Sequence, residues 1–302
     1  MYSSYELINS VSGSDSNPLG RFSFKGLCIS SGGLNGLYYL GVLDYHYGKK
    51  NLNHITHYSG TSIGSFINLL LIIGYTPKEI FIYICKYDIL AQFSNYSFSY
   101  LLENHALLDI DILKNYVEKI ILDKINYIPT LLELYNMFGK VFYSASYNLT
   151  NSCESSVYFS HFTHPDMLVS DAVVCSCSVP FLFSKTKLKE DTYVDGAIFD
   201  PTPVKVLLEH FDQEDYPLIL TISLREKGEK GDTNSFIGYA SRVAEAIIYS
   251  KKEEACKRTH LIEIESKILP FVFNMDTSTK IELFIEGKKT ALSKYKLKEK
   301  LD

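Results

Sequence analysis

Tryptophan is absent from this chain of 302 residues, and cysteine occurs only 6 times. The cysteines form no C-x-x-C pair. Cys175 and Cys177 stand two positions apart on an expected helix, where their side chains point in different directions. This usage argues against a disulfide framework or a zinc site and favours small buried thiols in a reducing compartment. We therefore expect no metal.

Long hydrophobic runs are absent as well. The apolar run after Ser62 is interrupted by Asn68 and Gly74, well short of the roughly 18 residues that suggest a membrane span. Residues 1–19 form a polar extension without the apolar core of a secretory signal. The net charge of −5 is spread along the chain, which argues against nucleic-acid binding. We expect a cytoplasmic protein that can contact a membrane surface peripherally; its oligomeric state stays open.

The remaining composition suits one large domain over residues 20–302. Hydrophobic residues make up 46% of the chain, enough to bury a substantial core. Expected strands alternate with expected helices, which favours an α/β fold with helices on both faces of the sheet. The expected strands are 22–30, 55–59, 140–147, 155–160, 189–195, 217–223 and 260–264, and the expected helices are 35–47, 62–73, 77–85, 111–124, 130–137, 166–177, 203–211, 235–250 and 279–300.

The most informative motif is Gly60-Thr61-Ser62-Ile63-Gly64, which fits G-x-S-x-G. It lies between an expected strand and an expected buried helix. A serine on so tight a turn is held with its hydroxyl exposed, and the glycines let neighbouring chain pass close by. The N-terminus of the following helix favours developing negative charge. This context predicts that Ser62 is a nucleophile.

A glycine-rich loop, Ser31-Gly32-Gly33-Leu34-Asn35-Gly36, follows the first expected strand. Unpaired N–H groups in such a loop can bind a phosphate or an oxyanion. The loop lacks the lysine of a P-loop, and its spacing does not fit G-x-G-x-x-G. We therefore favour an oxyanion loop over a dinucleotide site.

A third motif is Asp195-Gly196-Ala197 at the end of an expected strand. Taken alone, the aspartate is more simply explained as a turn residue or a cap for the helix that begins at Val204. Taken with the serine turn and the glycine loop, it becomes a candidate catalytic residue.

In this order the three motifs resemble the patatin-like phospholipases, whose pattern is a G-G-G-x-[RK]-G loop, a G-x-S-x-G turn and a D-G-[GA] aspartate. The stretch from Asp171 to Phe181 is similar to the family's alanine- and serine-rich helix, which ends in a Pro–Phe turn. The resemblance covers about residues 20–265 and implies a three-layer α/β/α fold with a mostly parallel central sheet. It also implies a Ser62–Asp195 dyad, an oxyanion hole at Gly32, Gly33 and Leu34, and supporting roles for Gly36, Gly60, Gly64 and Gly196.

Three positions depart from the family pattern. Ser31 stands in place of the first loop glycine, and Asp200 stands in place of a common asparagine. Asn35 stands in place of the family's arginine or lysine, which removes a positive charge beside the oxyanion loop. That loss could lower activity or alter head-group choice.

The resemblance implies that Asp195 takes the serine proton directly and that no cofactor is needed. An aspartate with an ordinary pKa near 3.9 is a weak base, so the site must raise that pKa by desolvation or use a concerted proton transfer. A triad with histidine is the competing mechanism, and only His210 and His260 follow Asp195 in the chain. His210 is expected near a helix C-terminus and His260 at a strand edge.

Two segments of the chain can each be interpreted in two ways. Residues 86–139, rich in aromatic and leucine side chains between Phe93 and Leu102, form either a lipid-facing cap or ordinary packing over the core. Residues 278–302 form a basic amphipathic helix that either lies on an anionic membrane or docks by its apolar stripe. We favour docking.

The sequence thus predicts a lipid acyl hydrolase that cleaves fatty-acyl esters of phospholipids or related lipids through an acyl-enzyme intermediate. Two alternatives stay open. One is a catalytically weak or inactive lipid-binding protein that keeps the fold, which the Asn35 departure favours. The other is an esterase for neutral lipids or small esters.

Overall fold

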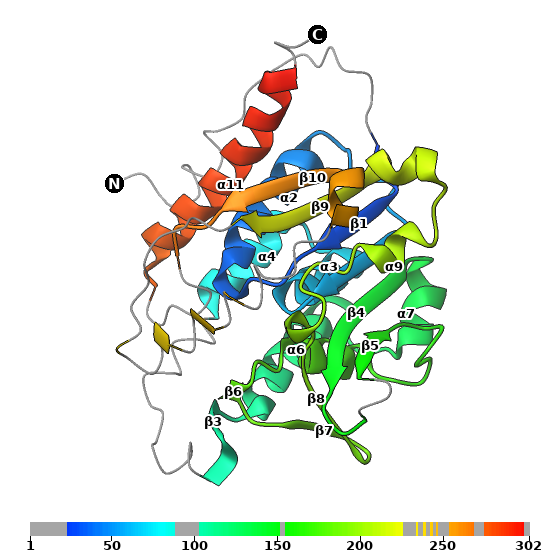
Figure 1. The fold of residues 1–302 in the computed structure, drawn as a ribbon, viewed down its shortest axis with the longest axis vertical. Coiled ribbons are helices and arrows are strands. Elements are labelled where there is room, and N and C mark those ends of the chain that lie inside the picture. Colours follow the sequence, from blue (N-terminus) through cyan, green and yellow to red (C-terminus); the bar gives the residue numbers. More distant parts are fainter. Residues whose placement is uncertain are drawn as a thin grey trace.

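The computed structural model describes residues 23–87, 103–151, 155–225, 254–268 and 275–298, together with isolated positions between 234 and 246. A mixed eight-stranded sheet lies at the centre of this described part (Figure 1). Its strands are β1 (Gly26–Ile29), β2 (His57–Thr61), β4 (Val141–Asn148), β5 (Ser156–Phe159), β7 (Thr186–Leu188), β8 (Asp191–Asp195), β9 (Ile219–Arg225) and β10 (His260–Glu265).

The strand order is β10-β9-β1-β2-β4-β8-β7, and β5 also pairs with β4. The strands from β10 to β4 pair in parallel, whereas β5, β8 and β7 add antiparallel pairings. All four residues of β1 are buried, as expected for a central parallel strand covered on both faces. The expected α/β fold with a mostly parallel sheet is confirmed.

Helices cover the sheet on two sides. They are α2 (Gly36–Gly48), α3 (Ile63–Ile72), α4 (Pro77–Lys86), α6 (Ile110–Ile125), α7 (Leu131–Phe138), α8 (Val169–Cys177), α9 (Lys205–Leu208) and α11 (Thr277–Lys298). Alternate residues of one strand face opposite layers: Leu27 joins the larger core under α2, α3 and α8, whereas Cys28 joins a smaller core with α9. Within the described residues, the layer on the α9 side is thin.

Each of the seven expected strands is present with shifted ends. The expected helix over 203–211 shortens to α9, because the N–H groups of His210 and Phe211 bond to carbonyls three residues back, which tightens the chain into a turn. Sequence reading missed β7 and the separate pair of β3 (Ala106–Leu108) with β6 (Phe181–Phe183), since three residues are too few for a visible alternation.

Parts of the predicted organisation fall outside the described residues. These are the N-terminal extension, the aromatic stretch from Phe93 to Leu102 and most of the expected helix over 235–250.

The C-terminal helix α11 packs along α2, which agrees with the docked reading (Figure 1). Phe284 is 1% exposed, and the two backbones touch at glycines on both helices. A Cβ added to Gly287 would lie 2.0 Å from the carbonyl oxygen of Tyr38, and one added to Gly41 would lie 1.9 Å from that of Phe284. Lys288 reinforces the contact through a 2.8 Å ion pair with Asp44 of α2.

Candidate active site

The register along β4 brings the serine turn and the aspartate strand together. β2 pairs with β4 until Thr61 meets Ala145, and β8 pairs with β4 from Ser146, which meets Asp195. β5 pairs with the opposite edge of β4, along a stretch that overlaps the pairings of both β2 and β8. β2 and β8 therefore lie along the same edge of β4. Ser62 and Asp195 therefore project from neighbouring points of the same edge.

Ser62 occupies a strained turn between β2 and α3. Its φ is 57° and its ψ is −125°, a conformation that residues with a side chain rarely adopt. Close approach of the backbone explains the flanking glycines. A Cβ on Gly64 would lie 2.2 Å from the carbonyl oxygen of Ile29, and one on Gly60 would lie 2.5 Å from the carbonyl carbon of Gly64.

Asp195 is 4% exposed, and burial raises its pKa from 3.8 to about 6. Two interactions oppose that rise: a hydrogen-bonding interaction with the Ser62 side chain and a 2.8 Å hydrogen bond from the Ala197 N–H. Gly196 lets the chain turn here, because a Cβ would lie 2.3 Å from the carbonyl oxygen of Ala145. A buried carboxyl with a raised pKa thus lies at the end of the strand that meets the serine turn.

The end of α8 lies in the stretch that resembles the family's serine-rich helix, and it holds both residues in place. The Ser62 N–H donates to Ser176 Oγ at 2.9 Å, and the Asp195 N–H donates to the Ser178 carbonyl oxygen at 2.9 Å. Cys177 lies between them in the chain, and burial raises the pKa of its thiol well above the usual value. Ser176 and the C-cap residue Ser178 thereby fix the geometry of the pair.

The glycine-rich loop forms a 3₁₀ turn (Gly33–Asn35) that leads directly into α2. Gly33 has a φ of 55°, which favours glycine at this position. N–H groups at the start of a helical turn have no partner within it, so those of Gly33 and Leu34 are available to an anion. Both residues line the pocket that contains Ser62, whereas Gly32 does not. Gly36 lies against Ile63, because a Cβ there would lie 2.4 Å from the Ile63 side chain.

Hydrogen bonds tie the glycine-rich loop and the serine strand to the segment that follows Asp195. The Ser31 N–H donates to the Pro201 carbonyl oxygen at 2.8 Å, and Ser30 Oγ donates to the same oxygen at 3.0 Å. Thr61 Oγ1 donates to the Asp200 carbonyl oxygen at 2.8 Å. The three motifs, far apart in sequence, therefore form one hydrogen-bonded unit.

The two departures in the loop have structural roles. Ser31 is buried, and its carbonyl oxygen accepts a 2.8 Å hydrogen bond from the Tyr39 hydroxyl. Asn35 is 1% exposed and braces the loop: its Nδ2 donates to the Gly32 carbonyl oxygen at 3.0 Å, and its Oδ1 accepts from Ser266 Oγ at 2.5 Å.

The third departure, Asp200, forms a turn of its own. Its carboxylate accepts from the Thr202 N–H at 3.2 Å and from the Tyr158 hydroxyl at 2.5 Å. The Asp200 side chain therefore stabilises the turn that follows it.

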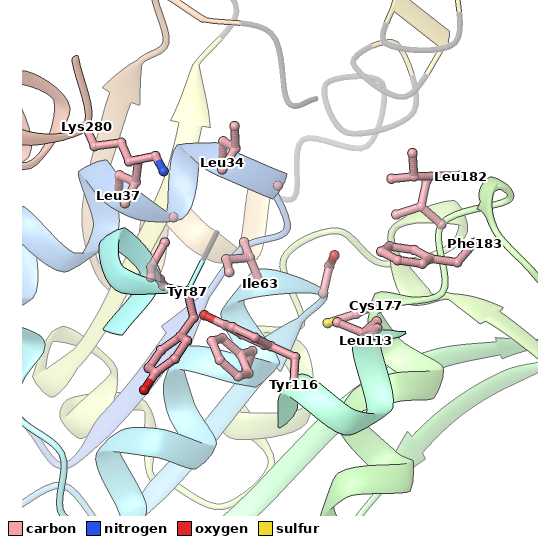
Figure 2. A pocket seen from close by; sticks show the side chains of 16 residues that line it. Leu34, Leu37, Ile63, Tyr87, Leu113, Tyr116, Cys177, Leu182, Phe183 and Lys280 are labelled. Carbon is pink, nitrogen blue, oxygen red and sulfur yellow. The ribbon is translucent and has the colours of Figure 1, made fainter. Parts of the chain in front are cut away.

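An apolar pocket opens beside Ser62 (Figure 2). Tyr87, Leu113 and Tyr116 line it, so the segment expected to act as a cap or as packing supplies part of the pocket wall. Aliphatic and aromatic side chains from the α2, α3 and α8 region supply most of the rest. The remaining lining residues are Leu34, Leu37, Ile63, Phe66, Ile84, Val179, Leu182 and Phe183, together with Gly33, Gly36, Cys177 and Lys280.

The two candidate histidines lie elsewhere. The His210 ring hydrogen-bonds the Tyr143 hydroxyl at 2.6 Å beside a second cavity, and His260 packs against Phe24 and His46. Within the described part of the chain, no histidine lines the pocket that contains Ser62. The described geometry gives no support to a triad.

A strand–serine–helix turn, a glycine-rich loop and a buried aspartate at the carboxyl end of a parallel sheet define an α/β protein of the serine-hydrolase type. The sequence matches the profile described as patatin-like phospholipase over residues 27–208. The chain belongs to the patatin-like phospholipase family.

Relatives in viruses and bacteria share this similarity. A probable lipid hydrolase of Invertebrate iridescent virus 6 is 31% identical over 194 residues, which cover 63% of this chain and 66% of that protein. An uncharacterized protein of Acanthamoeba polyphaga mimivirus is 26% identical over 280 residues, 88% of this chain and 92% of that protein. The crystal structure of VipD from Legionella pneumophila shares the fold with a TM-score of 0.56 at 16% identity, covering 90% of this chain and 66% of VipD. The chain thus spans just under two thirds of the iridescent-virus protein and of VipD.

Metal-binding clusters and membrane-spanning helices are both absent from the described part of the chain. The described residues hold no group of three histidine, cysteine or acidic side chains placed to bind a metal. None of the helices in the described ranges is both long enough and apolar enough to cross a bilayer.

Proposed function

We propose that this protein is a lipid acyl hydrolase that cleaves fatty-acyl esters of phospholipids or related lipids with a Ser62–Asp195 dyad. The observation that carries the proposal is the register along β4, which brings the buried Asp195 to the serine turn beside an apolar pocket. Family membership and the lipid-hydrolase name of the iridescent-virus relative support the same activity. We also propose that the enzyme acts at a membrane surface in the cytoplasm.

In the first step, Ser62 Oγ attacks the carbonyl carbon of the ester while its proton passes to the Asp195 carboxylate. A serine hydroxyl is a poor nucleophile until a base removes its proton. The raised pKa of Asp195, about 6, makes it a better base than an ordinary aspartate while leaving it mostly ionised near pH 7. The carbonyl oxygen becomes an oxyanion, which the N–H groups of Gly33 and Leu34 stabilise.

In the second step, the tetrahedral intermediate collapses and the C–O bond to the alcohol breaks. Asp195 returns its proton to the leaving alkoxide, so an alcohol departs and the acyl group stays on Ser62. Asp195, again ionised, removes a proton from a water molecule that attacks the acyl-enzyme. Fatty acid is released and Ser62 regains its proton.

The apolar pocket suits the acyl chain of such a substrate. Burial of hydrocarbon stabilises a complex by about 0.8 kcal/mol per methylene group. The walls formed by Phe66, Leu113, Tyr116 and Phe183 offer this environment next to the nucleophile.

Labelling with a fluorophosphonate probe tests the proposal. The wild-type protein should be labelled, the Ser62→Ala variant should not, and Asp195→Asn should react far more slowly. Ser65→Ala, which removes a buried hydroxyl from the same helix, is the matched control and should label normally. Release of fatty acid from phospholipid vesicles and from monoacylglycerol micelles should follow the same order.

Two results would overturn the proposal. Labelling that persists in Ser62→Ala would place the reactive serine elsewhere. A folded wild-type protein that neither reacts with the probe nor hydrolyses any lipid ester, with or without vesicles, would favour the alternative of a lipid-binding protein.

A further inference from the structure

The outer edge of β5 carries no charge. Within the described residues β5 pairs with β4 alone, so no neighbouring strand covers its other side. Its sequence, Ser156-Val157-Tyr158-Phe159, contains neither a charged residue nor a proline. The strands at the two ends of the sheet differ (Figure 1), because β10 contains Glu263 and Glu265 and β7 contains Lys187. Charged residues and prolines commonly keep other strands from pairing with an exposed edge, and β5 lacks both.

The backbone of Ser156 faces this open side. The Asn148 N–H donates to the Ser155 carbonyl oxygen at 2.7 Å, so these two residues form a hydrogen-bonded pair. Such pairs alternate along antiparallel strands, and the register therefore turns the N–H and the carbonyl of Ser156 away from β4. Ser156 is exposed, and within the described residues neither of these outward groups has a hydrogen-bond partner. One donor and one acceptor are thus open to an added strand.

A groove follows the same edge and reaches both faces of the sheet. Ser156 and Tyr158 of β5 line it. Tyr143, which belongs to the smaller core, lines it on the α9 side, and Tyr193, which belongs to the larger core, lines it on the opposite side. A cavity with these walls runs along the edge strand, and we call it the β5 groove. Side chains of an added strand, which point alternately to the two faces, would meet a wall on each side.

One wall of the β5 groove presents an exposed aromatic ring on a fixed turn. Phe162 is 62% exposed and lines the groove. The next residue, Thr163, holds the turn against β5: its Oγ1 accepts from the Ser160 N–H at 3.1 Å and donates to the Tyr158 carbonyl oxygen at 2.9 Å. A fixed ring of this kind can pack against the stem of a lysine or arginine and attract its positive charge.

The carboxylates of the β5 groove make its walls acidic. Asp191 and Glu209 line it, and no lysine or arginine is among its described lining residues. Neither carboxylate forms an ion pair in the described part of the chain. Lys189, whose charge helps to lower the pKa of His164 after the larger effect of burial, does not itself line the groove. The charge of the groove therefore complements a basic ligand.

We propose that the β5 groove binds an extended peptide that carries lysine or arginine and adds to β5 as a further strand. The peptide backbone would pair with the outward groups of Ser156, and its basic side chains would reach Asp191 and Glu209. A second copy of the chain is the less suitable occupant, because its β5 would bring an uncharged strand to an acidic groove. The inference does not depend on the proposed hydrolysis, since the groove and the pocket at Ser62 share no described lining residue.

Fluorescence anisotropy with labelled peptides tests the charge preference. The probes are peptides of about nine residues in which valine and threonine alternate, with lysine, glutamine or glutamate at the same two positions. At slightly alkaline pH, wild type should bind the lysine peptide at least about tenfold more tightly than the glutamate peptide. Asp191→Asn combined with Glu209→Gln should bring these affinities within about threefold of each other. Glu190→Gln is the matched control, because it removes an exposed carboxylate outside the described lining, and it should keep the preference.

A proline tests the strand pairing separately. Ser156→Pro removes the outward N–H without removing a hydrogen bond to β4, so it should weaken binding of the lysine peptide by about tenfold or more. Ser156→Ala keeps the N–H and should bind like wild type, and circular dichroism checks the fold of each variant. If the proline variant does not fold, the charge variants still decide.

Three results would overturn the inference. The first is equal affinity of wild type for the lysine and glutamate peptides, or no binding of the lysine peptide up to about 1 mM. The second is binding that neither a folded Ser156→Pro variant nor the combined Asp191 and Glu209 variant weakens. The third is a dimer in light scattering that Ser156→Pro dissociates, because β5 would then pair with a second copy of the chain.

Discussion

Replacement of Asp195 by asparagine should stabilise the fold above pH 6 while removing the proposed base. Burial raises the pKa of Asp195 from 3.8 to about 6, so the ionised carboxyl is disfavoured in the folded chain. A rise of about 2 pKa units corresponds to about 3 kcal/mol at 1.36 kcal/mol per unit. Relaxation of the variant and altered hydrogen bonds reduce the net gain to about 1–3 kcal/mol.

The sign of the effect depends on pH. Between pH 3.8 and about 6 the folded chain binds more protons at this carboxyl than the unfolded chain, so the free energy of unfolding falls as pH rises through that window. Below this pH window the carboxyl is neutral in both states. Above it the carboxyl is charged in both states, and the full free-energy cost of burying the charge lowers the stability of the folded chain. The asparagine is neutral throughout, and its Oδ1 can still accept the Ala197 N–H.

Urea unfolding of wild type and Asp195→Asn, from about pH 4 to about pH 8, measures the difference. Near pH 4 the variant should be only slightly more stable than wild type. Near pH 8 it should unfold at a clearly higher urea concentration than wild type. Equal m values would show that both proteins expose the same surface. A difference that does not vary with pH, or a variant less stable than wild type at pH 8, would refute the raised pKa.

Two further predictions concern the supports of the site. Ser176→Ala should leave the Ser62 N–H buried without an acceptor, at a cost of about 1–3 kcal/mol, and should lower the rate of fluorophosphonate labelling at unchanged secondary structure. Ser176→Thr keeps a hydroxyl and should restore the rate; failure of this rescue would remove the positioning role. Gly287→Ala should force α11 away from α2 and lower the free energy of unfolding by about 1–3 kcal/mol in urea titrations, whereas Gly48→Ala, with open space around it, should not destabilise through a clash. Equal effects of the two alanines would contradict the close contact.

Local patterns explain what the sequence could predict. The turn at Ser62 needs a short strand, two glycines and an apolar helix in succession, all within the span from His57 to Ile72. The glycine-rich loop and the turn after Asp195 are equally local. Their contact could be expected only from the family resemblance. The spacing of residues 62 and 195 does not indicate which strands are neighbours in the sheet.

Contacts between distant segments explain what could not be predicted. Ser176 meets Ser62 across 114 positions, and Ser266 meets Asn35 across 231 positions. Such single hydrogen bonds have no periodicity, so the resemblance identified the end of α8 as a family helix without indicating that Ser176 accepts a hydrogen bond from Ser62. Lys280 was hidden in the same way, since a lysine on an amphipathic helix is ordinarily exposed and only the docking of α11 buries it.

The register on β4 also explains why a dyad without histidine suits this fold. The partners of Thr61 and Asp195 on β4 are the consecutive residues Ala145 and Ser146, and consecutive strand residues are about 3.3 Å apart. In the proposed dyad the serine turn and the carboxyl therefore meet along one sheet edge, and neither candidate histidine lines the pocket there. Burial offsets the loss, because it raises the pKa of Asp195 to about 6, close to the ordinary histidine value of about 6.5. Burial at this sheet edge therefore gives the aspartate a base strength similar to that of a histidine.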